Sequence, residues 1–422
     1  MKRYWSSILV VLLVAAGIAT YAFAGATDHL PEYKLETVQG DPKEAEGFAL
    51  SGFYGGRKYS EYMKVDTNGT WYDSRHENMR EMLFGMDWLY SRSDVAELVS
   101  KHRSFMRGKK QPEHLYADEQ SVIHVSEAYD NGGEGGGKKL TLELSVLDRS
   151  TGQVQQWKTE TEVNLSGPYL YSFIQDVQRI GDDVHVMVTY LTRNDEQAWF
   201  DYRLGLTSGE LLSANPVGLS GNDESGSPAA RIESVMAPDL LTDSSEYVVL
   251  IANESSDEPK NDPVQDGQTA RVDADSGEPE SVEKYYSYSY RTGKTAAVPE
   301  SFTKETNERD PSFMIVSGNE LIRAHRGDSG VRIDRYSLEA EKQTVSLQIA
   351  AKELGGASIG QIRMEGDRAY VLVQGSSPTA AVLDTRNGEL LYLGKAAYQG
   401  PAELEADEMS YLDLDNIEIN GY

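Results

Sequence analysis

Two short segments of this sequence combine residue types that could carry out catalysis, and each lacks a required group. The glycine-rich run 132–139 is similar to a phosphate-binding P-loop, but Lys139 stands where Ser or Thr must hold magnesium. His76 and Glu77 begin the H-E-x-x-H pattern of zinc peptidases, but Arg80 occupies the position of the second histidine ligand. We interpret the first segment as a hairpin tip and expect no zinc at the second.

The other segments that could supply a nucleophile or metal ligands also lack required residues. Segment 327–330 is similar to the nucleophile segment of trypsin-like proteases, but Val331 replaces the next glycine and no matching upstream histidine context is present. The histidines are scattered without ligand spacing: His29, His76, His102, His114, His124, His185 and His325. The chain has no cysteine, which excludes disulfides, thiol nucleophiles and Cys-ligated metals. We therefore expect no metal and no cofactor, and the sequence names no catalytic residue.

One cluster of bases could contact an anionic surface. Its members are Lys101, Arg103, Arg107, Lys109 and Lys110, with no acid between them. Near anionic lipid headgroups each such base contributes about 1 kcal/mol, and wall polymers offer similar charge. The same residues also suit the solvated C-terminal end of a helix, where cations complement the helix dipole. Both interpretations stay open.

Composition limits the class of protein. The chain has 422 residues with 40 Lys and Arg against 68 Asp and Glu, a net charge of −28. Nucleic-acid binding is excluded, because contact with phosphates needs a basic face. Hydrophobic residues make up 39% of the chain, which is enough for a packed core and excludes wholesale disorder.

The N-terminus predicts export. Lys2 and Arg3 precede an uncharged apolar run, residues 8–24, which as a helix would span about 25 Å. This run could stay as a single membrane anchor, or cleavage after Ala24 at an A-x-A site could release a secreted protein. In either case the remaining chain lies outside the cytoplasm. We assign residues 1–25 to this segment and 26–44 to a linker.

The body of the chain, residues 45–422, predicts an all-β fold. Alternating or β-branched runs recur at 122–125, 140–147, 184–191, 247–251, 313–316 and 370–373. Short polar turns recur with them at 66–69, 148–152, 207–209, 290–293 and 384–388, with a degenerate copy at 336–340. These are hairpin turns, in which Asp accepts local backbone N–H bonds and Gly adopts a positive φ. After allowance for two insertions, the repeat length is that of four-stranded propeller blades.

These repeats resemble a known family. The D-x-x-T-G units at Asp148 to Gly152 and Asp384 to Gly388, with weaker copies at Asp66 and Tyr290, resemble quinoprotein-like β-propeller repeats. The resemblance implies a single propeller of about six blades and no particular ligand. A β-sandwich, or two β-domains with similar turns, is the alternative. The chain as a whole resembles exported proteins of Gram-positive bacteria.

Three segments modify this pattern. Residues 76–110 have helical periodicity and predict a helical hairpin insert. Residues 253–284 are acidic with almost no apolar side chain, and predict a disordered loop without calcium-binding spacing. The tyrosine-rich run 285–290 predicts a strand, either packed or serving as an aromatic platform. The alternating stretch 411–419 either completes the first blade and closes the ring or forms an ordinary edge strand.

Two functional hypotheses follow. The first is a non-catalytic binding or scaffold module at the cell surface, whose partner is a protein or a cell-wall ligand. The second is a propeller-type hydrolase or lyase acting on wall polysaccharide, which needs two facing carboxylates about 5–10 Å apart at the channel mouth.

Overall fold

The computed structural model describes most of the chain after residue 29. The described residues are 30–55, 60–73, 93–109, 111–129, 139–163, 165, 169–192, 197–219, 231–255, 281–303, 312–327 and 329–419, with the isolated helical positions 14 and 17. None of the helices in these ranges is long and apolar enough to cross a membrane. Most of the predicted anchor, residues 8–24, lies outside them.

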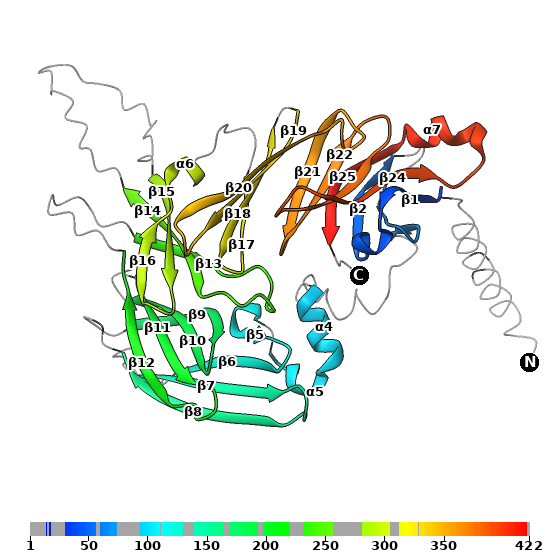
Figure 1. Cartoon of the computed structure of the whole chain (residues 1–422). Coiled ribbons are helices and arrows are strands. Elements are labelled where there is room, and N and C mark those ends of the chain that lie inside the picture. Colours follow the sequence, from blue (N-terminus) through cyan, green and yellow to red (C-terminus); the bar gives the residue numbers. More distant parts are fainter. Residues whose placement is uncertain are drawn as a thin grey trace, which may run out of the picture.

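The described strands form six antiparallel sheets, which follow one another in chain order (Figure 1). Sheet 1 contains β2 (Phe48–Gly55), β3 (Ser60–Val65), β4 (Thr70–Tyr72) and, from the end of the chain, β25 (Leu412–Ile419). Sheet 2 contains β5 (Leu115–Ala117), β6 (Ser121–Tyr129), β7 (Lys139–Asp148) and β8 (Val154–Glu162). Sheet 3 contains β9 (Tyr169–Ile180), β10 (Asp183–Thr192), β11 (Gln197–Gly205) and β12 (Leu211–Val217).

The second half of the chain repeats this plan. Sheet 4 contains β13 (Arg231–Met236), β14 (Tyr247–Ser255), β15 (Ser281–Ser289) and β16 (Lys294–Ala297). Sheet 5 contains β17 (Ser312–Ser317), β18 (Glu320–Gly327), β19 (Gly330–Ser337) and β20 (Lys342–Ala350). Sheet 6 contains β21 (Ser358–Glu365), β22 (Arg368–Gln374), β23 (Thr379–Asp384), β24 (Leu390–Tyr398) and β1 (Tyr33–Gly40).

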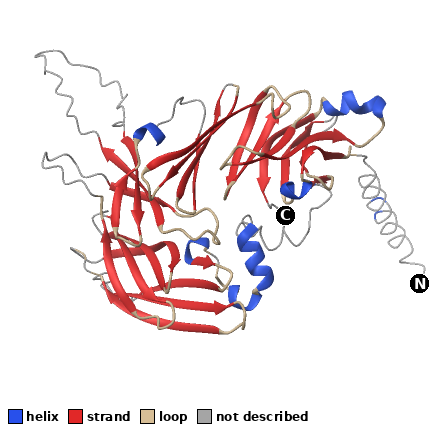
Figure 2. Cartoon of the chain, viewed as in Figure 1, coloured by secondary structure: helices blue, strands red, loops and turns tan. Residues whose placement is uncertain are grey.

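Helices are short and few among the described residues (Figure 2). They are η2 (Pro42–Ala45), α4 (Ser93–Lys101), α5 (Arg103–Met106), η4 (Pro112–His114), α6 (Glu300–Thr303), η6 (Ala402–Leu404) and α7 (Glu405–Met409). The predicted insert 76–110 is therefore helical in its second half, and its first half lies outside the described residues.

From sheet 2 round to sheet 1, neighbouring sheets pack their apolar side chains against each other. Separate buried clusters join sheets 2 and 3, 3 and 4, 4 and 5, 5 and 6, and 6 and 1. A sixth cluster packs α4 and α5 onto sheet 2 together with Leu241. Six antiparallel sheets, five of four strands and one of five, that follow one another in chain order are consistent with the predicted β-propeller.

The six predicted turns all connect the third and fourth strands of a sheet. Five have glycine at positive φ: Gly69, Gly152, Gly209, Gly293 and Gly388. At the first turn Asp66 Oδ1 accepts the N–H groups of Asn68 and Gly69 at 2.6 and 2.9 Å. The degenerate sixth turn places Glu341 at φ 51°, the one positive φ of a residue other than glycine in the described ranges. The prediction that these segments are hairpin turns with glycine at positive φ is confirmed.

These turns mark one end of the sheets. In sheets 2 to 6 a backbone hydrogen bond of 2.9–3.0 Å ties each of them to the segment between the first and second strands. The pairs are Arg149–Gln120, Leu206–Asp182, Tyr290–Glu246, Leu338–Asn319 and Thr385–Asp367. Both connections therefore lie at the same end, which we call the turn end; the opposite end is the far end.

The last strand completes the first sheet. β25 pairs with β2 from Phe48 opposite Ile419 to Tyr54 opposite Leu412, and Leu414 and Ile417 are buried against sheet 6. Of the two alternatives for residues 411–419, completion of the first blade is confirmed, with β25 at one edge of sheet 1. Residues of β25 also contact β21 and β22, so sheets 6 and 1 lie side by side (Figure 1).

The first described strand corrects the predicted linker. Residues 33–40, within the expected linker 26–44, form β1 and pair with β24 as the fifth strand of sheet 6. Tyr33 is fully buried; its backbone exchanges hydrogen bonds with Thr70 Oγ1, and its hydroxyl donates to the Glu408 carbonyl at 2.9 Å. Alternation of apolar and charged residues from Tyr33 onward was the signal that the linker assignment overlooked.

The ends of the predicted acidic loop also need correction. β14 and β15 continue their pairing to Asn253 opposite Glu283 and Ser255 opposite Ser281. Backbone pairing to a neighbouring strand orders these polar residues without any apolar burial, which composition alone cannot indicate. Residues 256–280 lie outside the described residues.

A segment between β13 and β14 spans the middle of the molecule at the turn end. We call residues 238–246 the strap. The Asp239 N–H bonds the Val316 carbonyl, and the Asp239 carboxylate accepts the Gly366 N–H. Leu241 donates its N–H to Asp94 of α4 at 2.7 Å, and its carbonyl accepts the Ala117 N–H. The strap thus ties α4 and sheets 2, 5 and 6 to sheet 4.

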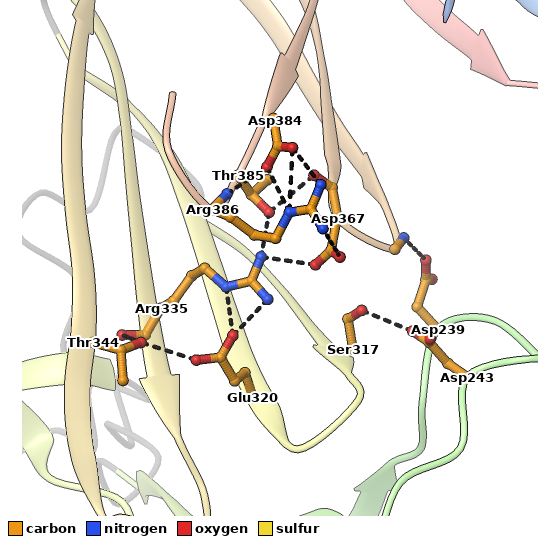
Figure 3. A network of polar contacts seen from close by, with 11 residues as sticks. Asp239, Asp243, Ser317, Glu320, Arg335, Thr344, Asp367, Asp384, Thr385 and Arg386 are labelled. Atoms are coloured by element: carbon orange, nitrogen blue, oxygen red, sulfur yellow. Dashed lines mark hydrogen bonds and ion pairs between the residues drawn. The ribbon is translucent and has the colours of Figure 1, made fainter. Parts of the chain in front are cut away.

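A polar network beside the strap joins sheets 5 and 6 (Figure 3). Arg335 of β19 is buried; its Nε bonds Glu320 at 2.7 Å, and its Nη1 bonds Asp367 and Thr385 at 2.8 and 2.7 Å. Asp367 and Thr385 belong to the two connections at the turn end of sheet 6. A single guanidinium with five N–H donors can therefore fix both against sheet 5.

The sixth turn generates a stability prediction. Glu341→Gly should raise the free energy of unfolding by about 1 kcal/mol, because only glycine adopts a positive φ without strain. Urea denaturation of both proteins measures the change. Glu339→Gly, at an exposed position of the same turn without positive φ, is the matched control and should not stabilise. Equal stabilisation by both changes would contradict the prediction.

Candidate functional site

Chemistry-bearing side chains gather on the face of sheet 3 that packs against sheet 4. Residues directly opposite each other in an antiparallel sheet share a face, as do alternate residues along a strand. The pairing places four successive rows on this face: Gln178, His185 and Arg203; Asp176, Met187 and Asp201; Phe173, Thr189 and Trp199; Tyr171, Leu191 and Gln197. We call this face, with the sheet 4 residues that cover it, the seam.

A β-bulge in β9 puts Phe173 and Tyr171, the β9 members of the last two rows, on the seam. Between Met187 and Val188 the pairing of β10 shifts from Asp176 to Ile174, so one residue of β9 is extra. Ile174 consequently joins the cluster between sheets 2 and 3, while Phe173 turns to the seam. One-residue bulges redirect side chains in this way.

Two buried carboxylates hold the centre of the seam. Asp201 is fully buried; its oxygens lie 3.0 and 3.1 Å from His185 Nδ1, and one also accepts the Tyr288 hydroxyl at 3.1 Å. Asp176 accepts the Tyr290 hydroxyl at 2.6 Å and the Gln178 side-chain amide at 3.0 Å. All four carboxylate oxygens therefore have protein partners.

Burial sets the protonation of this cluster. The pKa of Asp176 rises to about 6, chiefly because the group is buried; the hydrogen bond from Tyr290 opposes this rise, and nearby Asp201 contributes to it. Burial also raises the pKa of Tyr290 far above its ordinary value, with the Asp176 carboxylate adding to the effect. Tyr290 thus stays a neutral donor, and Asp176 changes charge in mildly acid solution.

A pocket opens at the turn end of the seam. Its volume is about 270 Å³, and it is lined by His185, Arg203, Asn215, Tyr290, Arg291, Thr292 and Gly293. His185 directs Nδ1 to Asp201, so Nε2 is the ring nitrogen that this carboxylate leaves free. Arg203 bonds Asp183, and Arg291 bonds Glu246 through two nitrogens, which leaves further N–H donors on each guanidinium.

The far end of the seam is different in character. Tyr171 and Phe173 are 55% and 49% exposed, and their rings are stacked with centroids 6.3 Å apart. Beside them Thr189 Oγ1, Gln197 Oε1 and Trp199 Nε1 are buried without a hydrogen-bond partner. The seam therefore has a pocket lined by two arginines and a histidine at one end, and at the other an aromatic surface whose sheet 3 residues are uncharged.

The basic cluster predicted to contact anionic surfaces lies elsewhere: its described members run from the end of α4 through α5 to Lys109. Lys101 pairs with Glu97 one helical turn earlier, and Arg103 and Arg107 are exposed. Lys109 donates to the Phe105 carbonyl at 2.6 Å and lies over the Phe105 ring, while burial lowers its pKa. Lys110 lies outside the described residues. Contact with an anionic surface stays a prediction.

The incomplete motifs resolve into ordinary structure where they are described. Lys139 of the glycine-rich run begins β7 and pairs with Glu160 at 3.6 Å. Gly330 begins β19 in a hairpin with β18. His76, Glu77 and Arg80 lie outside the described residues. Within the described ranges, no three His, Asp or Glu side chains are placed to hold a metal ion. In the tyrosine-rich run, Tyr288 and Tyr290 are packed in the seam.

Sequence reasoning missed the seam residues. His185 and Asp201 are 16 residues apart and meet only because β10 and β11 pair in one particular register. The strand over 184–191 was predicted, but its register and the bulge in β9 were not. The available signal was a histidine and an aspartate at seam-facing positions of two adjacent apolar strands.

Comparison with known proteins does not assign a family. No protein-family model matches the chain, and no curated protein matches it. Partial similarity occurs to the cobalt-substituted ACO of Synechocystis (11% identity, 68% of this chain and 64% of that chain, TM-score 0.33). It also occurs to the Dos1 propeller (13%, 69% and 74%, 0.26) and a luciferin-regenerating enzyme (12%, 67% and 78%, 0.24).

These similarities are too weak to carry a functional argument. The chain spans 61–65% of the length of the ACO and ACO/RPE65 structures that it matches first. All the TM-scores given above lie below 0.5. The site must therefore be argued from its own geometry.

The buried carboxyl of Asp176 generates a prediction of pH dependence. Its folded pKa of about 6 exceeds the ordinary 3.8, so its stabilising contribution is complete in acid and is lost as pH rises through 6. Relative to Asp176→Asn, the wild type should lose about 1–2 kcal/mol of unfolding free energy between about pH 5 and about pH 8. Urea denaturation at both pH values measures this.

The control for this prediction is Asp182→Asn, an exposed carboxylate of the same sheet. Its difference from the wild type should stay constant between the two pH values. A constant difference for Asp176→Asn as well would contradict the assignment of a raised pKa to this group.

Proposed function

We propose that this protein is a non-catalytic binding module outside the cytoplasm, and that its pocket binds an oxyanion group of a protein or cell-wall ligand. The observation that carries the proposal is the pocket lined by His185, Arg203 and Arg291. Guanidinium and imidazole N–H groups that converge on one cavity suit a carboxylate or a phosphate. The β-propeller arrangement positions the residues of the pocket, but it does not itself indicate a binding role, since a fold does not determine function.

The electrostatics make this pocket distinctive. The chain carries a net charge of −28, yet two arginines and a histidine line one cavity of about 270 Å³. Asp201 fixes the orientation of His185, and the salt bridges of Arg203 and Arg291 hold the two guanidinium groups in place. Preorganised donors lower the entropy cost of binding.

The alternative, hydrolysis of a wall polysaccharide, has less support. It requires a carboxylic acid and a carboxylate that both reach the substrate. Asp176 and Asp201 are 4% and 0% exposed, and every oxygen of each already has a protein partner. They are suited to holding the seam together and to orienting His185.

Calorimetric titration with inorganic phosphate and with acetate tests the pocket. We expect a dissociation constant of about 1 mM for at least one of them, a weak value because the probes are small. Arg291→Gln should weaken binding by about tenfold, since it removes a charge-assisted donor. Lys294→Gln, the same charge change on the neighbouring strand outside the pocket, should leave affinity unchanged. Absence of binding, or equal loss in both variants, would overturn the proposal.

We further propose that residues 8–24 hold the protein on the outer side of a membrane. Since β1 begins at Tyr33, only the seven residues 26–32 follow Gly25 before the sheets, a span of about 15 Å if flexible. Sheet 6, which contains β1, would then lie nearest the bilayer. Retention of the native protein in membranes after carbonate washing supports anchoring, and a mature N-terminus at Gly25 would overturn it.

The basic cluster generates a separate prediction. Residues 26–422 should co-sediment with anionic vesicles at low salt and lose this binding when all five bases are changed to Gln: Lys101, Arg103, Arg107, Lys109 and Lys110. Neutral vesicles are the control and should not bind. If the five substitutions have no effect, the cluster is only the solvated end of α5.

A further inference from the structure

The far end of the seam contains polar atoms that the fold does not use. Thr189 and Trp199 lie directly opposite each other on β10 and β11 and are 8% and 4% exposed. Thr189 Oγ1 and Trp199 Nε1 have no hydrogen-bond partner, nor has Oε1 of Gln197 in the next row. A buried polar atom without a partner lowers stability, so three on one face of one sheet need an explanation.

Exposed aromatic rings lie in the same rows. Phe173 is paired with Thr189, and Tyr171 with Leu191 beside Gln197, so these rings and the unpartnered atoms share the seam face. The two rings are stacked at an interplanar angle of 29° and are about half exposed. The bulge in β9 places them there, where a regular strand would have placed Ile174.

We propose that this surface, which we call the far-end site, binds a sugar ring of a neutral saccharide. Its members are Tyr171, Phe173, Thr189, Gln197 and Trp199. They supply aromatic faces for the apolar face of a ring, together with neutral N–H, O–H and carbonyl groups that pair with hydroxyls. None of the five is charged, so an ionic ligand held by them would lose hydration without gaining a counter-charge from these residues. The proposal is independent of the oxyanion pocket at the turn end.

Titration calorimetry of the full chain with cellotetraose, maltotetraose and chitotetraose tests the far-end site. At least one of these neutral probes should bind, and tetragalacturonic acid should bind at least tenfold more weakly. Phe173→Ala should weaken binding of the neutral probe at least tenfold. Phe313→Ala, an aromatic ring on β17 that is 41% exposed, is the matched control and should change nothing. Failure of all three probes, or equal loss in both variants, would overturn the proposal.

A second variant separates ligand binding from an internal water. Thr189→Val keeps the side-chain shape and removes the unpartnered hydroxyl. If the hydroxyl serves a ligand, the variant should bind the saccharide several-fold more weakly and melt at the same or a higher temperature. If the hydroxyl instead holds a structural water with Trp199, the variant should melt at a lower temperature with unchanged affinity, and the proposal would be wrong. Oxyanion binding should be the same in all these variants.

Discussion

The pairing of β25 with β2 is the constraint on which the other contacts depend. It joins residues near the two ends of the chain, Phe48 with Ile419, and gives sheet 1 its fourth strand. Without it, β2 would present unpaired N–H and C=O groups along its whole length. The same strand carries Leu414 and Ile417 into the core shared by sheets 6 and 1. Buried clusters join neighbouring sheets from sheet 2 round to sheet 1, so β25 completes the last sheet of this series.

The interfaces between neighbouring sheets differ in polarity. Sheets 5 and 6 share a core of aliphatic side chains, with the polar contacts of Arg335 at their turn end. Sheets 3 and 4 bury Asp176 and Asp201 within their interface. Burying such groups is tolerated only where each is hydrogen-bonded, and here the tyrosine hydroxyls of β15 and its turn provide the bonds. Both proposed binding sites lie at this interface between sheets 3 and 4.

Features that depend on interactions between residues close in the sequence could be predicted, whereas features that depend on the pairing of distant segments could not. The turn at Asp148 to Gly152 depends on hydrogen bonds within a few residues, so its pattern was sufficient. Alternation over residues 411–419 predicted a strand, and its place in the first sheet was one of two alternatives. The meeting of His185 with Asp201 depends on strand register, and the exposure of Phe173 depends on one extra residue in β9. Local pattern contains neither, because a shift by one residue exchanges the faces of a strand.

Tyr33 has a mechanical consequence. Tension on the chain before it would reach the folded body over Leu30 to Tyr33, because Leu30 is buried in the core of sheets 6 and 1 and the Pro31 carbonyl accepts the Tyr72 hydroxyl. The backbone of Tyr33 is bonded to Thr70 of sheet 1, its hydroxyl to Glu408 beside α7, and its ring lies 5.8 Å from that of Tyr398 in sheet 6. A pull would thus load two sheets at once before it could peel β1 from β24. β25 does not pair with β1, but its Leu414 and Ile417 share a core cluster with Tyr33, so a load on Tyr33 also acts on the core that holds the strand completing sheet 1.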